Sequence, residues 1–266
     1  MDQLIKDLAT KARKAGRYLA ASDYSTRVNA VLAIADALVQ RKAEILAANE
    51  RDIAKARESG MVESLIDRLL LTSERIDGIA NAARKVSRLP DPLQQTLRER
   101  TLENGLHLRQ VSVPFGVIGM IYEARPNVTV DAAVILLMSG NAALLRGSAS
   151  ASESNSILIA IMKDALATTT ISPEVIQQVP SDDRNSVTAL LHARGSIDLV
   201  IPRGSAELIR MVVNEARVPT IETGAGVCHV YFDESAEEKI AIPILINAKT
   251  QRPSVCNAAE TLLVHQ

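Results

Sequence analysis

Cys256 is the residue of this chain best suited to nucleophilic chemistry. It lies in a polar stretch, a few positions after Lys249 and Arg252. Nearby cations lower the pKa of a thiol and so raise the fraction of thiolate, the form that attacks electrophiles. The ordinary alternative for an isolated cysteine is a small buried hydrophobic residue. We keep that interpretation for Cys228, which lies in a segment that alternates like a strand, and treat Cys256 as the candidate nucleophile.

Two polar side chains lie at the ends of predicted elements, where they could stabilise a developing charge or accept a proton. Asn127 directly follows Pro126, at the start of a buried helix predicted for 128–138. Its ordinary role would be to cap that helix. From the same place its amide, backed by the positive end of the helix dipole, could stabilise an oxyanion. Glu222 follows a short strand predicted for 219–221, where it could act as a base or simply be exposed.

A turn with a glycine offers a second kind of chemistry, the binding of phosphate. Gly204 and Ser205 follow a strand predicted for 197–201 and open a predicted helix, so unpaired backbone N–H groups could hold a diphosphate there. Arg146 ends another predicted strand and could contact a ribose 2′-phosphate. Turn geometry and a solvated cation are the ordinary alternatives. The Gly-x-Gly-x-x-Gly fingerprint is absent from the sequence, which argues against an ordinary dehydrogenase.

The elements that must position these residues centre on 113–147. The apolar run 117–121 has the length and branching of a strand buried on both faces, and Pro126 prevents a helix from running through it. A helix over 128–138 then ends at Gly140, and 142–145 forms the next strand. Together they predict one right-handed strand–helix–strand unit.

The rest of the chain extends this pattern. Helices predicted over residues 2–88, with Ser22 and Thr72 as N-caps, form a helical lead-in. Asn104-Gly105 is a two-residue hairpin signal, which predicts an exposed β-arm over 95–113 that pairs with a partner subunit. Downstream, strands and helices alternate and predict an α/β fold with a doubly wound, mainly parallel sheet. The expected helices are 152–166, 183–191, 206–216 and 236–248, and the expected strands are 175–179, 197–201, 219–221 and 227–232.

Composition excludes several classes of function. The 266 residues are 47% hydrophobic, enough for a sizeable core. With 30 basic and 31 acidic residues the net charge is −1, so no global field favours nucleic acid or an anionic membrane. No apolar run reaches the roughly 18 residues of a membrane span, and the start of the chain does not resemble a signal peptide. Two cysteines are too few for a disulfide framework. The spacing of these cysteines and of the four histidines does not match that of metal ligands. A cytoplasmic location is the default expectation.

Taken together, these residues resemble the aldehyde dehydrogenase superfamily, and within it the γ-glutamyl phosphate reductase family. The resemblance covers the whole chain. The motifs that carry it are Gly116-Val117-Ile118-Gly119, Tyr122-Glu123-Ala124-Arg125-Pro126-Asn127-Val128-Thr129-Val130-Asp131, Pro202-Arg203-Gly204, Val227-Cys228-His229, Asn247-Ala248-Lys249-Thr250-Gln251-Arg252-Pro253-Ser254 and Cys256-Asn257.

The resemblance implies a role for each candidate residue. Cys256 matches the nucleophile and Asn127 the oxyanion-hole amide. The cofactor NADPH would be bound by Arg146, Gly204, Ser205 and Glu222, the last of which matches the base position of hydrolytic relatives. The substrate-binding candidates, for phosphate and carboxylate groups, are Arg125, Lys249 and Arg252. No metal site is expected.

The implied reaction is the reduction of L-glutamyl 5-phosphate to L-glutamate 5-semialdehyde and phosphate, in L-proline biosynthesis. The Cys256 thiolate would attack the acyl phosphate, phosphate would leave to give a thioester, and NADPH would supply hydride. The resemblance further implies a homo-oligomer and a possible functional coupling to glutamate 5-kinase, with no nucleic-acid or membrane partner.

The resemblance also implies a domain plan. The Rossmann-like sheet would be of the aldehyde dehydrogenase type, preceded by a helical N-terminal lead-in and a β-hairpin arm. Family members continue well beyond the nucleophile, whereas this sequence stops ten residues after it. The alternative function is therefore a catalytically incomplete fragment that retains only nucleotide-binding or interaction capacity. The expected parts are a lead-in at 1–94, an oligomerisation arm at 95–113, an NADP-binding domain at 114–229 and the incomplete start of a catalytic domain at 230–266.

Overall fold

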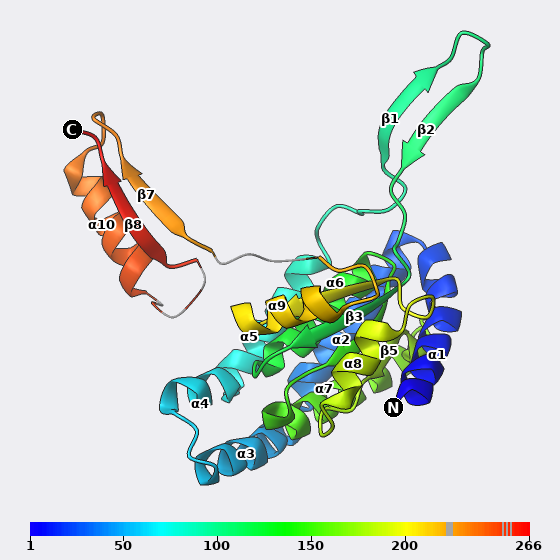
Figure 1. Cartoon of the computed structure of the whole chain (residues 1–266), viewed down its shortest axis with the longest axis horizontal. Helices are drawn as coiled ribbons and strands as arrows, with labels where there is room; N and C mark the ends of the chain where they lie inside the picture. Colours follow the sequence, from blue (N-terminus) through cyan, green and yellow to red (C-terminus); the bar gives the residue numbers. More distant parts are fainter. Residues whose placement is uncertain (222–225, 252, 254, 256) are drawn as a thin grey trace. The chain divides into compact units, whose positions relative to one another are not determined.

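The computed structural model describes residues 1–221, 226–251, 253, 255 and 257–266. It divides into two compact units, Met1–Glu222 and Thr223–Gln266 (Figure 1). In the described residues, no helix is both long and apolar enough to cross a membrane.

The first unit is organised around a four-stranded parallel sheet with the strand order β5-β4-β3-β6. Its strands are β3 (Val117–Tyr122), β4 (Ala142–Arg146), β5 (Ile176–Gln178) and β6 (Leu199–Arg203). The chain moves outward from β3 to β5 and then returns to place β6 on the other side of β3. This reversal makes a topological switch point between β3 and β6, the place where open α/β sheets bind ligands.

Helices cover both faces of the sheet, which confirms the α/β, doubly wound prediction. They are α1 (Asp2–Ala21), α2 (Tyr24–Gln40), α3 (Lys42–Glu58), α4 (Glu63–Leu69), α5 (Ser73–Val86), α6 (Pro126–Met138), α7 (Ser152–Ala167), α8 (Asn185–His192) and α9 (Ala206–Glu215), with 3-10 turns at Ala149–Ala151 and Pro173–Val175. Alternate residues of β4 face opposite cores because side chains on a strand alternate. Ala143 and Leu145 pack with α2, α5, α6 and α7, whereas Ala142 and Leu144 pack with α1, α8 and α9.

The central strand–helix–strand unit, β3-α6-β4, is confirmed. Other boundaries differ from the prediction. The strand expected at 197–201 begins two residues later, because the N–H of Ile197 closes a turn onto the carbonyl of Ala193. The strand expected at 219–221 is wrong: only an isolated bridge joins Thr220 to Val200.

One of the two predicted N-caps is confirmed. The Thr72 side chain accepts a hydrogen bond from the N–H of Arg75 at 3.2 Å and caps α5. Ser22 does not cap α2. Asp23 does so, accepting from the N–H of Thr26 at 2.7 Å, because it is the residue directly before the helix.

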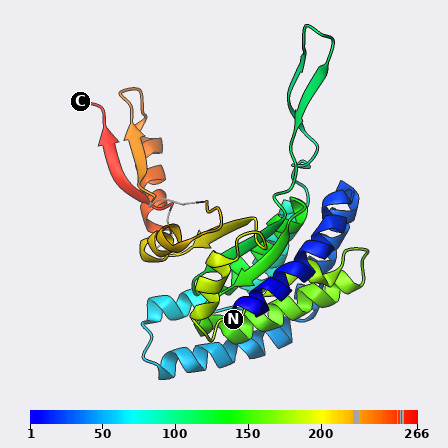
Figure 2. The ribbon, with the colours of Figure 1, turned by 45° about the vertical axis from the view of Figure 1, so that its right-hand side comes forward.

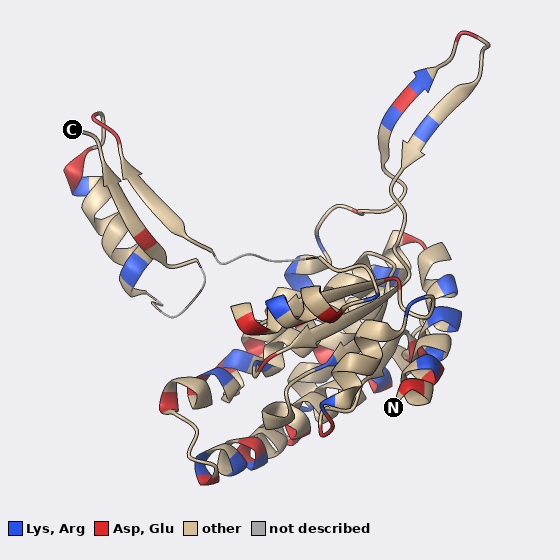
Figure 3. Ribbon diagram, viewed as in Figure 1, with Lys and Arg blue, Asp and Glu red and all other residues tan. Residues whose placement is uncertain are grey.

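The predicted hairpin is present as a separate two-stranded sheet, β1 (Thr96–Thr101) with β2 (His107–Val111) (Figure 2). Its turn is longer than predicted. The N–H of Leu102 still pairs with the carbonyl of Leu106, which leaves a three-residue loop in which Gly105 has φ +81°. Such loops place a glycine in the left-handed region. Charged side chains occupy both exposed strands (Figure 3).

The second unit repeats the strand–helix–strand pattern with β7 (Cys228–Phe232), α10 (Glu238–Thr250) and β8 (Ala259–Val264). β7 and β8 pair in parallel. The helix begins two residues later than expected, and β8 was not predicted. Cys228, expected in the core, is only partly buried.

Candidate active site

A cleft of about 650 Å³ opens in the first unit at the carboxyl ends of the strands. Residues at or just after the ends of β3, β4 and β5 line it, together with residues of α8 and one face of α9. This is the edge of a parallel sheet where ligands bind. The polar residues that line it include Glu123, Arg146, Ser148, Ser181, Arg184 and Ser205.

Arg146 is half-buried at the end of β4 and points its guanidinium into this cleft region. It donates to the carbonyl of Ser181 at 3.3 Å and to Oγ of Ser186 at 3.4 Å. Burial lowers the pKa of Arg146, and the neighbouring positive charge of Arg184 lowers it further. The nearby Asp182 carboxylate acts in the opposite direction. Arg146 and Arg184 supply positive charge that could hold a phosphate group, in a cleft that Glu123, Asp182, Glu207 and Glu215 also line.

The turn between β6 and α9 has the form that the sequence predicts. Ser205 caps α9, with its Oγ accepting from the N–H of Leu208 at 3.3 Å. Gly204 lies close to two side chains, because a Cβ there would lie 2.6 Å from Cδ of Glu123 and 2.8 Å from Cδ2 of Leu208. The Glu123 carboxylate itself accepts two hydrogen bonds from Ser205.

Asn127 lies inside the first turn of α6, so the expectation that it caps the helix is wrong. The helix starts at Pro126, and Arg125 occupies the cap position. Proline is well accommodated at the first helical position because the N–H that it lacks would have no partner within the helix. The Asn127 amide donates from Nδ2 to Oδ2 of Asp131 at 3.0 Å.

Asp131 holds that amide from one turn further along α6. Burial raises the pKa of Asp131, and its hydrogen bond from Asn127 acts in the opposite direction. Its carboxyl borders a groove of about 200 Å³ between α5 and α6. Sequence reasoning missed both Asp131 and Glu123. The signals available were an i,i+4 pair on a predicted helix and a glutamate directly after a buried strand.

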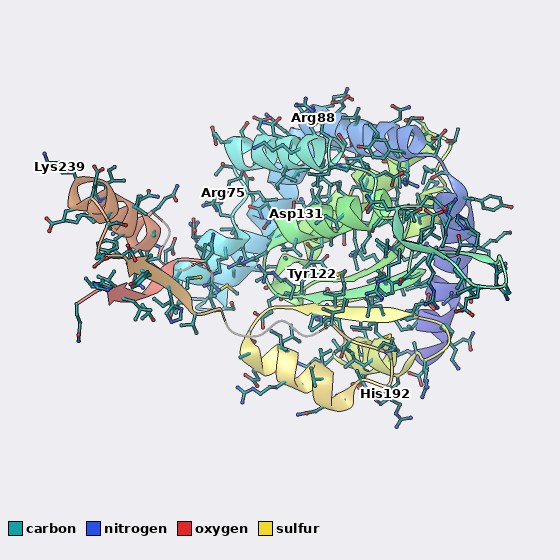
Figure 4. All side chains as sticks on the ribbon, turned by 90° about the horizontal axis from the view of Figure 1, so that it is seen from above. Arg75, Arg88, Tyr122, Asp131, His192 and Lys239 are labelled. Carbon is teal, nitrogen blue, oxygen red and sulfur yellow. The ribbon has the colours of Figure 1, made fainter. Side chains whose placement is uncertain are left out.

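A buried hydrogen-bonded chain fixes the start of α6 to the sheet. Tyr122 Oη lies 2.8 Å from Oγ1 of Thr129, which donates to Oδ1 of Asn155 at 2.7 Å. Burial raises the pKa of Tyr122, so its phenol stays protonated. The chain links β3, α6 and α7, and Figure 4 shows Tyr122 in the sheet beneath the helix that carries Asp131.

We expect Thr129→Val to destabilise the protein by about 1–3 kcal/mol, because it leaves two buried polar groups unpaired without changing side-chain volume much. The midpoint of thermal unfolding should fall by several degrees. Thr188→Val, on the exposed face of α8, is the matched control. Equal midpoints for the two variants would show that the buried chain contributes nothing.

The structure leaves part of the predicted site undescribed. Three predicted residues lie outside the described residues: Glu222, Arg252 and Cys256. Lys249 lies exposed in the last turn of α10, in the second unit, whereas Arg125 and Asn127 belong to the first. Their assembly around Cys256 therefore stays a prediction. Among the described residues, no group of three or more His, Cys, Asp or Glu could hold a metal ion.

Comparison with known proteins identifies the class. Residues 2–266 match the aldehyde dehydrogenase family. The chain therefore belongs to the aldehyde dehydrogenase family, in agreement with its α/β fold.

Particular relatives narrow the comparison. The chain is 53% identical over 261 residues to a gamma-glutamyl phosphate reductase of Thermobifida fusca, covering 98% of this chain and 62% of the relative. A gamma-glutamyl phosphate reductase structure from Thermotoga maritima superposes with a TM-score of 0.90 at 44% identity, covering 98% of this chain and 63% of the other. The Saccharomyces cerevisiae structure of that name gives 0.76 at 33% identity, covering 97% and 65%. The chain thus spans a little less than two thirds of the length of these relatives.

Proposed function

We propose that the protein reduces L-glutamyl 5-phosphate to L-glutamate 5-semialdehyde and phosphate, using NADPH, in L-proline biosynthesis in the cytoplasm. The observation that carries the proposal is the 53% identity to a gamma-glutamyl phosphate reductase over 98% of this chain. Identity of that size over nearly every element makes a shared reaction the simplest expectation. The groups that the reaction needs are also present in the sequence.

In the proposed mechanism Cys256 is the nucleophile. Its thiolate attacks the acyl carbon, and the amide of Asn127 with the backbone N–H of Cys256 stabilises the oxyanion. Phosphate leaves, and Cys256 holds the glutamyl group as a thioester. The hydride that reduces the thioester to the aldehyde level would come from NADPH when it is bound. Release of the Cys256 thiolate then gives the semialdehyde. Because no thioester is hydrolysed, a hydrolytic base is not required, and the proposed role of Glu222 is to bind the cofactor.

The structure of Asn127 supports its role. One N–H of the amide points to Asp131, an acceptor that fixes which end of the amide carries the nitrogen. The second N–H, for which the described residues supply no acceptor, would donate to the oxyanion. The position inside the first turn of α6 adds the positive end of the helix dipole.

Two features of the cleft support NADPH as the cofactor. Gly204 and Ser205 would hold the diphosphate at the start of α9, where backbone N–H groups and the positive end of the helix dipole attract an anion. Arg146, with Arg184 nearby, would hold the 2′-phosphate that distinguishes NADPH from NADH. Arg125, Lys249 and Arg252 are the proposed contacts to the substrate's phosphate and carboxylate groups.

Arg146→Gln should raise the Kd for NADPH by about tenfold to a hundredfold, the usual loss when a charged hydrogen bond to phosphate is removed. The Kd for NADH should change by less than about twofold. Both are measurable by quenching of dinucleotide fluorescence. Arg210→Gln, which removes a positive charge from α9, is the control. Equal losses for the two dinucleotides would place Arg146 away from the 2′-phosphate.

The exposed hairpin supports a proposal about assembly. Its two strands are exposed except for Val111, and among the described residues they pair only with each other. We propose that it pairs with another subunit in a homo-oligomer. Functional coupling to glutamate 5-kinase is proposed only from the reaction, since an acyl phosphate must be supplied by a kinase.

The experiment that tests the function is the reverse reaction. The purified 266-residue chain is given glutamate 5-semialdehyde, phosphate and NADP, and NADPH formation is followed. Turnover that needs phosphate supports the proposal. NADPH binding without turnover would favour the alternative of a nucleotide-binding fragment, and absence of both would contradict the cofactor assignment as well.

A further inference from the structure

The N-terminus of α9 already holds a carboxylate of the chain itself. Glu123 directly follows β3 and accepts from the N–H of Ser205 at 3.0 Å and from Oγ of Ser205 at 2.6 Å. These donors belong to the turn proposed to bind the diphosphate of NADPH. The positive end of the helix dipole attracts a carboxylate there for the same physical reason that it attracts a phosphate.

The glutamate also fills the space above the turn. A Cβ on Gly204 would lie 2.6 Å from Cδ and 2.8 Å from Cγ of Glu123, so the side chain lies directly over the backbone that a diphosphate must approach. The backbone of Glu123 is held in place, because its N–H donates to the carbonyl of Arg203 at 3.2 Å. This bond joins the ends of β3 and β6 at the switch point of the sheet. A diphosphate bound at this turn would therefore need the same donors and the same volume as the carboxylate.

The side chain of Glu123 is able to leave. It is exposed, so rotation about its own bonds carries the carboxylate into water without disturbing the core. Its charge has the same sign as a diphosphate, so the two anions repel each other within one site. Both Glu123 and Ser205 line the cleft, which places this competition inside the proposed cofactor site.

We propose that Glu123 is a built-in competitor that occupies the diphosphate position in the absence of cofactor and swings out when NADPH binds. The proposal rests on the proposed function, which supplies the cofactor. The apparent affinity for NADPH is then reduced by the fraction of molecules in which the carboxylate is seated. In the absence of cofactor, the Glu123 carboxylate stabilises the start of α9.

The test compares NADPH binding and stability in Glu123→Gln. Removing the charge weakens the competitor, so the Kd for NADPH should fall by about threefold to tenfold. The unfolding midpoint without cofactor should fall at the same time, because α9 loses its stabilising anion. If Glu123 had only a structural role, Glu123→Gln would lower the unfolding midpoint and weaken NADPH binding together. Opposite changes are therefore specific to competition.

Two further variants separate local competition from general charge. Glu207→Gln removes a charge from the first turn of α9 while leaving the Glu123 contact to Ser205 in place, and it should tighten NADPH binding less than Glu123→Gln does. Glu123→Asp keeps the charge but shortens the reach to Ser205, and should also tighten binding. Adenosine 2′-monophosphate has no diphosphate, so its affinity should be the same for all variants.

The Kd values for NADPH either support the competition by Glu123 or overturn it. A Kd that rises in Glu123→Gln would mean that the carboxylate helps to hold the cofactor, for example at a ribose hydroxyl, and would overturn the proposal. An unchanged Kd, or a fall equal to that of Glu207→Gln, would overturn it too. Binding by Glu123→Gln alone would support it strongly. No NADPH binding by any variant, the unchanged chain included, would overturn the proposed cofactor site and the competitor with it.

Discussion

Replacement of Cys256 by Ser is expected to reduce phosphate-dependent NADPH formation at least about a thousandfold, because a serine hydroxyl lacks both the acidity and the nucleophilicity of the thiol. The variant should still bind NADPH with unchanged affinity. The same substitution should abolish labelling of that position by thiol reagents. Initial rates with glutamate 5-semialdehyde, phosphate and NADP measure the loss.

The chain supplies its own matched control, since the only other cysteine is Cys228. It lies on β7 and is partly buried. Cys228→Ser should retain most of the activity. Loss of activity in Cys228→Ser alone, or turnover that survives Cys256→Ser, would contradict the thioester mechanism.

Asn127→Ala is expected to lower kcat by about a hundredfold to a thousandfold, the usual cost of removing one oxyanion-hole donor. The KM for the semialdehyde should change little, because the amide acts mainly on charge that develops in the transition state. The Kd for NADPH should be unchanged. Steady-state kinetics and dinucleotide binding together test all three expectations.

Asp131→Asn is the informative companion to that variant. Its side-chain carbonyl still offers an acceptor to the Asn127 amide, so most of kcat should be retained. Asp131→Leu removes the acceptor and should lower kcat while leaving NADPH binding intact. If Asn127→Ala kept a normal kcat, the oxyanion would have to be stabilised by other donors, and the resemblance would have misassigned this residue.

Regular periodicity explains which parts of the fold could be predicted. The segments 117–121 and 128–138 are apolar because they are buried. The predicted bounds of β3 and α6 therefore lie within two residues of those in the structure. Short elements with mixed patterns were placed less well. The strand expected at 219–221 became a single bridge at Thr220, and β8 was missed because its leucines and valine are interpretable only once a partner strand is known.

Local turn chemistry was predicted less completely than the strands. Thr72 capped its helix as expected, but Asp23 displaced Ser22, and Pro126 displaced Asn127 into the helix. Asp23 caps α2 because it lies directly before the helix, whereas α6 starts at Pro126 and has no side-chain cap. Such competition between adjacent residues depends on where the first helical turn begins, which periodicity locates only to within a few positions.

The amino-acid sequence by itself determined the family, the identity of the candidate nucleophile and oxyanion donor, and the helix-opening turn at Gly204 and Ser205. Only the tertiary structure decided that Glu123 meets Ser205, 82 positions away. The reason is that this contact depends on strand order: β6 must lie beside β3, on the side away from β4. The hydrophobic pattern predicts that a strand is buried. Which strand pairs with it depends on the packing of the whole sheet.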